Sequence, residues 1–140
     1  MTKYCNDSSC GHNGFTDDKT VLEAADDAAS YNWHSDWRMP TAAEWQELDS
    51  SCTWTWTTRD GHNGYLVTGP NGNTIFLPAT GYRDSYLMSD GTDGNYWSSS
   101  LYTTVPSGGQ YFTFYEGYHN PASIRYRFYG CTIRPVFPLE

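Results

Sequence analysis

The sequence is poor in basic residues. Lysine occurs only twice, as Lys3 and Lys19, and the 8 lysines and arginines face 16 acids, so the formal net charge is -8. The basic residues form no cluster anywhere in the sequence. Nucleic acids and anionic membrane surfaces attract basic patches. The sequence therefore predicts that neither a nucleic acid nor an anionic membrane is the partner.

Long hydrophobic runs are also missing. No stretch approaches the roughly 20 apolar residues that a membrane-spanning helix needs, so no membrane insertion by this chain is expected. The first residues are polar, which predicts no signal peptide. A length of 140 residues without a linker or low-complexity stretch predicts one domain over 1–140 with a sizeable core.

Catalytic motifs are absent as well. There is no His-Glu-x-x-His pattern, and no Gly-x-Ser-x-Gly elbow surrounds the serines at 98–100. The paired acids at 17–18 and 26–27 are explained by solvation and helix dipoles. The four histidines are isolated among turn residues: His12, His34, His62 and His119. The sequence therefore predicts no catalytic residue and no enzymatic activity.

The metal-binding signals are weak. Cys5 and Cys10 precede His12 with the spacing of half a metal site, but the other half is missing. The acidic stretch 90–95 has the composition of a calcium loop without the alternating ligands and distal glutamate of an EF-hand, and tight turns use the same residues. We expect no metal and no cofactor. The four cysteines allow three disulfide pairings, and free buried thiols are the expectation for Cys52 and Cys131.

A clear helix start lies at 37–45, which reads Trp-Arg-Met-Pro-Thr-Ala-Ala-Glu-Trp. Thr41 is placed to cap the helix, and Glu44, three residues later, is placed to close a capping box. Pro40 keeps the preceding residue extended, so the helix cannot begin earlier. These residues predict a helix that starts at Thr41 and ends near 49–50.

The rest of the chain reads as α+β. A second helix is expected at 20–33, capped by Asp18. An N-terminal strand and loop are expected at 1–18, and a loop at 79–95. Strands are predicted near 3–4, 53–57, 65–68, 74–78, 96–99, 110–115, 124–128 and 132–136. The expected inward residues of the last strands are Trp97, Phe112, Phe114, Ile133 and Val136. The predicted fold is a single domain of two helices packed on short, mostly antiparallel strands with long ordered loops.

Three stretches carry a resemblance to a known family. They are 37–45, the Tyr-Trp-Ser-Ser-Ser at 96–100, and the pair Arg-Phe-Tyr-Gly at 127–130 and Ile-Arg-Pro-Val at 133–136. Together they resemble C-type lectin folds of the formylglycine-generating-enzyme type, as found in proteins of gut Bacteroidetes and their phages. Some of those proteins are the variable proteins of diversity-generating retroelements. The resemblance covers roughly 20–137 and implies a C-type lectin-like domain displayed outside the cell, on a cell or virion surface.

The segment 102–129 is rich in tyrosine mixed with Ser, Gly, Thr and Asn. This is the composition of an antibody paratope, in which tyrosine gives rigid contact area and the small polar residues give adaptable hydrogen bonds. An ordinary tyrosine-rich β surface is the alternative. Along 111–115, period two places Tyr111, Thr113 and Tyr115 on one face and Phe112 and Phe114 on the other. One strand is thus expected to hold the core and present a binding face.

The resemblance sharpens this prediction, because retroelement variable proteins change at adenines of Asn codons. Within 102–129 only Gln110 and Glu116 lie outside the reachable set of residues. The resemblance implies that Leu101, Pro106, Phe112, Phe114, Arg127 and Gly130 are also scaffold. The implied ligand-binding positions are Tyr102, Thr104, Val105, Ser107, Gly108, Tyr111, Thr113, Tyr115, Tyr118, Asn120, Ala122, Ser123, Ile124, Tyr126, Phe128 and Tyr129.

The function expected from these observations is binding of a cell-surface protein or glycan by a diversified, tyrosine-rich face, with Arg83 and Tyr86 contributing. One alternative is a static surface adhesin of the same fold. The other is a formylglycine-generating-type enzyme. That activity needs a closely spaced cysteine pair near the C-terminus, where this chain has only Cys131. Calcium-dependent sugar binding lacks its Glu-Pro-Asn, Gln-Pro-Asp and Trp-Asn-Asp triplets, and Asn120 with the following proline is the nearest fragment.

Overall fold

The computed structural model describes residues 1–34 and 36–137. It contains two helices and two sheets, with 43% of the chain in strands, so the fold is α+β as predicted. The helices are α1 (Ala28–Asn32) and α2 (Ala42–Ser51), and a short 3-10 turn spans His12–Gly14. No helix of the described part is long and apolar enough to cross a membrane.

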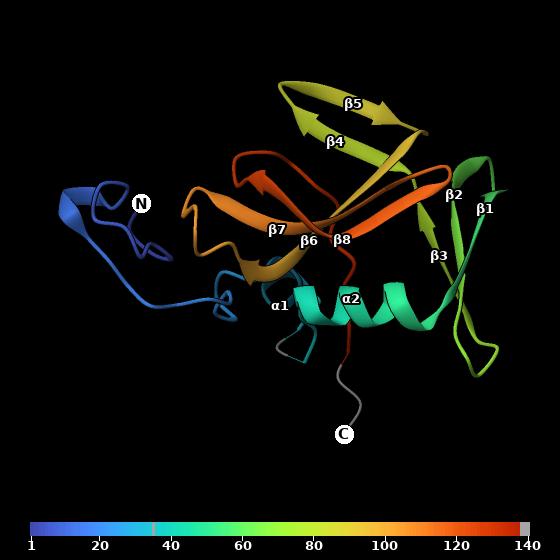
Figure 1. The fold of residues 1–140 in the computed structure, drawn as a ribbon, viewed down its shortest axis with the longest axis horizontal. Helices are drawn as coiled ribbons and strands as arrows, with labels where there is room; N and C mark the ends of the chain where they lie inside the picture. The colour runs from blue at the N-terminus through green and yellow to red at the C-terminus, as the bar shows by residue number, and fades with distance from the viewer. Residues whose placement is uncertain (35, 138–140) are drawn as a thin grey trace.

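The strands form a three-stranded and a five-stranded sheet (Figure 1). The first sheet has the order β1 (Thr53–Arg59), β2 (His62–Thr68), β3 (Thr74–Pro78). The second has the order β5 (Tyr86–Asp90), β4 (Thr80–Asp84), β6 (Asp93–Leu101), β7 (Gly108–Tyr115), β8 (Tyr118–Tyr126). All neighbouring strands are antiparallel except β4 and β6.

Helix α2 begins as its sequence predicts. The Thr41 hydroxyl accepts from the Glu44 amide at 3.2 Å, and the Glu44 carboxylate accepts from the Thr41 amide at 2.8 Å, so the capping box is formed. The helix packs across β6, β7 and β8. Its Trp45 ring stacks on Phe112 at 5.1 Å. The helix therefore anchors one face of the five-stranded sheet.

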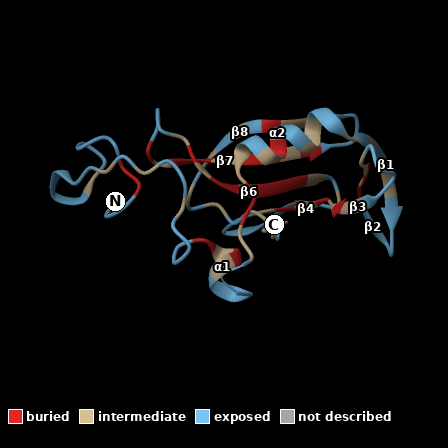
Figure 2. Cartoon of the chain, turned by 90° about the horizontal axis from the view of Figure 1, so that it is seen from below, coloured by how far each residue is buried: buried red, intermediate tan, exposed pale blue. Residues whose placement is uncertain are grey.

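The core lies between α2 and the two sheets. Figure 2 shows the buried residues along β6, β7 and the inner side of α2. As predicted, Phe112 and Phe114 are fully buried at 0% exposure. Trp97, Ile133 and Val136 are half-buried instead. Trp97 packs on Tyr111 and not on the core, Ile133 lines a pocket, and Val136 is bridged to Arg38 outside the two sheets. The complete buried cluster is Trp45, Tyr65, Val67, Leu77, Ala79, Tyr96, Phe112 and Phe114.

The predicted helix at 20–33 is wrong over most of its length. Only α1 at its end is helical, and its cap is Asp27, whose carboxylate accepts from the amides of Ala29 and Ser30. Asp18 caps no helix. Residues 20–22 instead run along the end of β6, where Val21 is bridged to Ser100. Pairing with the edge of a sheet has overridden the local helical pattern.

Three further predictions need correction. No strand forms near Lys3, since Tyr4 has a φ of 58°, in the left-handed region. The stretch 79–95, predicted as a loop, contains β4, β5 and the start of β6. These short polar strands show no clear alternation of apolar residues, so the sequence pattern does not reveal them, and pairing with neighbouring strands stabilises them. The predicted strand at 132–136 is reduced to isolated bridges from Thr132 to Tyr96 and from Val136 to Arg38.

Candidate ligand-binding surface

Strand β7 has the two-sided character that its sequence predicts. Phe112 and Phe114 face α2 and the three-stranded sheet, where Trp54 lies 5.2 Å from the Phe112 ring. Tyr111 belongs to the other face and contacts Trp97 with ring centroids 6.0 Å apart. The strand thus separates a closed core from a second face, which carries Tyr111.

Two of the positions predicted to bind ligand are buried. Tyr111 is only 7% exposed, because Trp97 and the guanidinium of Arg125 lie against its ring. Gly108 is also buried, and a Cβ there would lie 3.0 Å from Cγ2 of Ile124. Both residues therefore support the surface from below and offer no contact area of their own.

Four aromatic side chains near the end of β8 contact one another in a row. We call Tyr82, Tyr126, Phe128 and Tyr129 the aromatic ridge. Ring centroids are 5.6 Å apart between Tyr126 and Phe128, 4.5 Å between Phe128 and Tyr129, and 5.8 Å between Tyr129 and Tyr82. Phe128 is 73% exposed and Tyr126 is 53% exposed. Tyr126 and Phe128 thus form the exposed part of the ridge, and Tyr82 and Tyr129 are half-buried beside them.

A cation lies behind the ridge. The Arg125 guanidinium carbon is 3.8 Å from the centroid of Tyr82 and 5.1 Å from those of Tyr111 and Tyr129. Such cation–π contacts hold an arginine against aromatic faces. Its Nη1 atom is buried and has no hydrogen-bond partner among the described residues. Arg125 therefore fixes the rings of the ridge from their inner side.

Sequence reasoning did not single out Arg125 or Tyr82. Arg125 lies between Ile124 and Tyr126 in β8, and successive residues of a strand point to opposite faces of the sheet. The sequence therefore held enough information to place Arg125 on the face opposite these two neighbours. Tyr82 has no such local signal. It reaches the ridge because Gly130 is bridged to Arg83 of β4, a pairing between distant parts of the chain.

A hollow of about 380 Å³ lies beside the ridge. Five of its six lining residues are among the predicted positions, and Arg125 is the sixth. The five are Tyr102, Val105, Gly108, Ile124 and Tyr126. The loop after β6 and the end of β8 thus bring together residues as far apart in the sequence as Tyr102 and Tyr126. Ridge and hollow share Tyr126 and form one surface.

Tyr115 and Tyr118 form a second exposed aromatic pair, stacked at 4.8 Å beside the turn between β7 and β8. This pair is at the opposite end of the hairpin from Tyr126, which is paired with Gly108. Seven residues of strand separate the two ends, about 23 Å at the usual rise. The predicted positions therefore gather in two places instead of one continuous face.

The remaining predicted positions lie between or around these two clusters. Thr104 and Ala122 are exposed, and Ser107, Thr113, Asn120 and Ser123 are half-buried. Asn120 is held by a contact of its amide with the Tyr118 hydroxyl at 3.1 Å. The additional residues Arg83 and Tyr86 are both exposed, and Tyr86 is 78% exposed.

The expectations from sequence also concern the cysteines and the metal-ligating side chains. All four cysteines are free thiols, and burial raises the pKa of Cys131 to about 11. No group of three or more His, Cys, Asp or Glu side chains in the described residues is arranged to hold a metal ion. Within the acidic stretch 90–95, residues 91 and 92 form the tight turn between β5 and β6, in which the Thr92 amide donates to the Ser89 carbonyl at 3.1 Å.

No protein-family model matches the chain, and neither does any curated protein or solved structure.

Proposed function

We propose that the chain is a ligand-binding domain whose contact surface is the aromatic ridge together with the adjoining hollow. The observation that carries this proposal is the position of Phe128, which is 73% exposed and stacked between Tyr126 and Tyr129. Large aromatic groups clustered at a surface are typical of binding sites. They supply most of the binding energy at many protein interfaces.

The rigidity of the ridge supports the same proposal. Its rings are held by each other and by Arg125, so little side-chain freedom is lost when a ligand binds. The hollow beside it adds the apolar side chains of Val105 and Ile124 and the hydroxyl-bearing rings of Tyr102 and Tyr126. A cell-surface protein or a glycan is the proposed partner, since sugars and proteins both pack on exposed aromatic rings.

We further propose that the fold is C-type lectin-like, of the formylglycine-generating type. The motifs that carry the resemblance lie next to one another in space: Arg38 is bridged to Val136, and Tyr96 to Thr132. The serine motif at 98–100 also contacts the start of α2, where the Ser100 hydroxyl accepts from the Ala42 amide at 3.0 Å. Display outside the cell belongs to this proposal.

Diversification of the surface is proposed on the same basis. Most of the implied varied positions lie in loops or at the exposed edge strand β8, where a side chain can change without entering the core. The implied scaffold residues Phe112 and Phe114 are fully buried. Gly108 and Tyr111 are the least suitable positions for change, because both are packed against neighbours.

Binding is tested with the domain coupled to fluorescent beads and applied to a glycan array and to intact gut bacteria. For any ligand found, Phe128→Ala and Tyr126→Ala should each weaken binding by about 30-fold, the loss expected at a hot spot. Tyr31→Ala is the matched control, since Tyr31 is 79% exposed and belongs to α1. If the ridge variants bind as tightly as Tyr31→Ala does, the ridge is not the contact surface.

Diversification is tested by sequencing the DNA beside the gene. The proposal expects a reverse transcriptase and a near-copy of the segment for 102–129 that differs at adenines. If binding by the ridge is found without such a copy, the static adhesin becomes the function. The enzyme alternative gains nothing from the structure, because Cys131 is half-buried and its raised pKa keeps the thiol protonated at neutral pH.

A further inference from the structure

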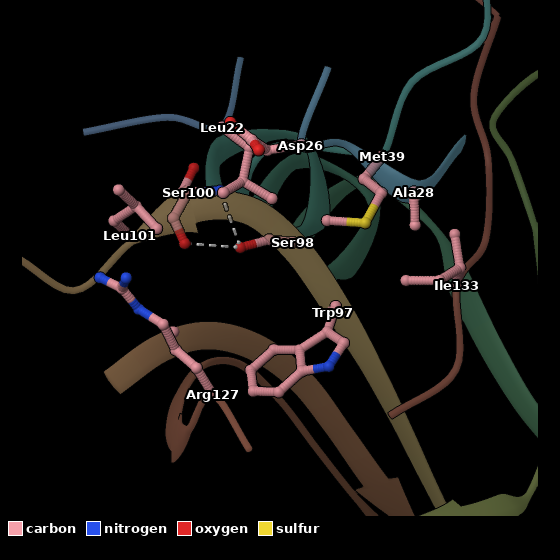
Figure 3. A pocket seen from close by; sticks show the side chains of 11 residues that line it. Leu22, Asp26, Ala28, Met39, Trp97, Ser98, Ser100, Leu101, Arg127 and Ile133 are labelled. Carbon is pink, nitrogen blue, oxygen red and sulfur yellow. Dashed lines mark hydrogen bonds between the residues drawn. The ribbon is translucent and has the colours of Figure 1, made fainter. Parts of the chain in front are cut away.

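A pocket beside β6 shares no lining residue with the aromatic ridge or with the hollow next to it (Figure 3). Its volume is about 250 Å³, slightly below the range of about 300–1,000 Å³ usual for drug-sized ligands. The wall is mostly apolar and is made by Leu22, Met39, Trp97, Leu101 and Ile133. In Figure 3 the Trp97 indole and the Arg127 side chain lie along one side, with Leu22 and Ser98 across from them. The pocket suits a small molecule with an apolar body.

The hydroxyl groups on this wall are already used within the protein. Ser98 donates to the carbonyl of Gln110 at 2.9 Å. The Ser100 hydroxyl accepts from the amide of Ala42 at 3.0 Å. Neither group needs a ligand to complete its hydrogen bonding.

The negative charge on the wall is also compensated. Asp26 accepts from the Lys3 ammonium at 2.7 Å and from the Tyr4 hydroxyl at 2.5 Å. These contacts lower the pKa of Asp26, with the hydrogen bond from Lys3 as the largest cause. Asp26 is therefore a neutralised carboxylate at the margin of the pocket.

Arg127 is the exception among the polar groups. Its Nη2 donates to the Tyr4 carbonyl at 2.9 Å, and its Nε to the Gly108 carbonyl at 3.3 Å. The contact of Nη1 is the Met1 sulfur at 3.7 Å, and a thioether is a weak acceptor. No carboxylate oxygen of the described residues lies within 4.0 Å of the guanidinium. Within the part of the chain that the structure describes, Arg127 is thus a cation without a counter-charge in direct contact, and it lines an apolar pocket.

The surroundings of Arg127 do not supply this counter-charge. Arg127 is half-buried, and this burial lowers the pKa of its guanidinium. The Asp17 carboxylate opposes that effect from a distance, but it accepts from the amides of Tyr4 and Cys5 at 2.7 and 2.9 Å. A partly desolvated charge is stabilised strongly by an anion that bonds to it directly.

We propose that this pocket binds a small carboxylic acid with an apolar body. The carboxylate pairs with Arg127, and the body packs against Trp97 and Met39. Charge complementarity selects an acid over its neutral analogues, because Arg127 is the only pocket-lining charge of the described residues that has no opposite partner. This site is separate from the aromatic ridge and does not depend on the function proposed for it.

The proposal is tested by titrating the isotopically labelled chain with benzoate and cyclohexanecarboxylate and following amide shifts by NMR. Saturable shifts should appear at residues of the pocket. Benzamide has the same shape as benzoate but no charge. It should bind at least about tenfold more weakly than benzoate, since a charge-assisted hydrogen bond is lost. Absence of saturable shifts with both acids would overturn the proposal, and so would equal binding of benzamide.

Two variants identify the site. Arg127→Gln should weaken benzoate binding by about tenfold or more, and Ala28→Leu should abolish it by filling the pocket from the start of α1. Ala28→Leu leaves Arg127 and its bonds to the N-terminal segment intact, so it remains informative if Arg127→Gln disturbs that segment.

The control is Arg59→Gln, a matched change at the exposed end of β1. Unchanged benzoate binding in both pocket variants would refute the assignment. Phe128→Ala should leave benzoate binding intact, which separates this test from that of the ridge.

Discussion

The Arg38 guanidinium binds both carboxylate oxygens of Glu44, with Nη1 2.7 Å from Oε2 and Nη2 2.6 Å from Oε1. The same carboxylate accepts from the Thr41 amide at 2.8 Å. One side chain therefore joins the capping box of α2 to the extended segment before it. Because Arg38 is also bridged to Val136, this junction connects the helix to the C-terminal segment.

The first prediction concerns acid stability. The hydrogen bond from Arg38 lowers the pKa of Glu44 from 4.5 to about 2. A lowered pKa means that the pair stabilises the fold above about pH 4.5 and that this contribution is lost as the pH falls towards 2. Both side chains are more than a third exposed, so screening limits the contribution to about 1 kcal/mol or less.

Glu44→Gln should therefore be less stable than the parent at about pH 7 and should lose less stability on acidification through this range. Urea unfolding at about pH 7 and about pH 3 measures the difference, with Glu47→Gln, an exposed change on the same helix, as the control. Equal loss of stability in the parent and in Glu44→Gln would contradict the assignment.

The second prediction compares two phenylalanines. Phe112 is 0% exposed and contacts Trp45 and Trp54, so Phe112→Ala should lower the free energy of unfolding by about 3–5 kcal/mol. Phe128 is 73% exposed, so Phe128→Ala should change it by at most about 0.5 kcal/mol. Thermal and urea unfolding of the two variants provide the test. A large destabilisation by Phe128→Ala would show that the ridge is structural and not free for a ligand.

The third prediction concerns the cap of α1. Asp27 is buried, and its carboxylate accepts from the amides of Ala29, Ser30 and Met39. Asp27→Ala leaves these donors without partners and should cost about 2–3 kcal/mol. Asp18→Ala is the control, because Asp18 is the cap expected from sequence and is exposed in the structure. Urea unfolding should show at most about 0.5 kcal/mol for it. Equal effects of the two changes would contradict the observed cap.

The fourth prediction concerns the thiols. Burial raises the pKa of Cys131 to about 11, whereas Cys10 is exposed. Because the thiolate is the reactive form, iodoacetamide at about pH 8 should modify Cys10 in the folded protein and leave Cys131 unmodified. Mass spectrometry of the digested protein identifies the sites. Denatured, unreduced protein should yield four reactive thiols, and fewer would mean that a disulfide forms.

The sequence alone predicted the features that depend on neighbouring residues. The capping box needs only Thr41 and Glu44 at the right spacing, and local geometry decides it. The two-sided strand β7 follows from alternating apolar residues, because successive side chains point to opposite faces. The strands predicted near 53–57, 65–68 and 74–78 form the first sheet, because alternating β-branched and aromatic residues favour a strand locally.

Contacts between distant segments decided the rest. Residues 20–27 carry a helical pattern, yet those at 20–22 pair with the end of β6, because an open sheet edge satisfies their backbone groups. The polar stretch 79–95 becomes strands only when its neighbours supply hydrogen bonds. Tyr111 was expected on the surface from its alternation, and it is buried because Trp97 and Arg125 reach it from other strands.

The candidate surface divides in the same way. The sequence determined which segment is rich in tyrosine and how its residues alternate along β7 and β8. It also determined that the chain has few basic groups with which to bind a nucleic acid. The tertiary structure decided that Tyr82 joins Phe128 and Tyr129 in one ridge, that Tyr115 and Tyr118 lie at the other end of the hairpin, and that Arg125 is the cation behind the rings. The physical reason is that alternation fixes the side of a strand on which a residue lies, whereas the neighbours across a sheet are fixed by strand order and register.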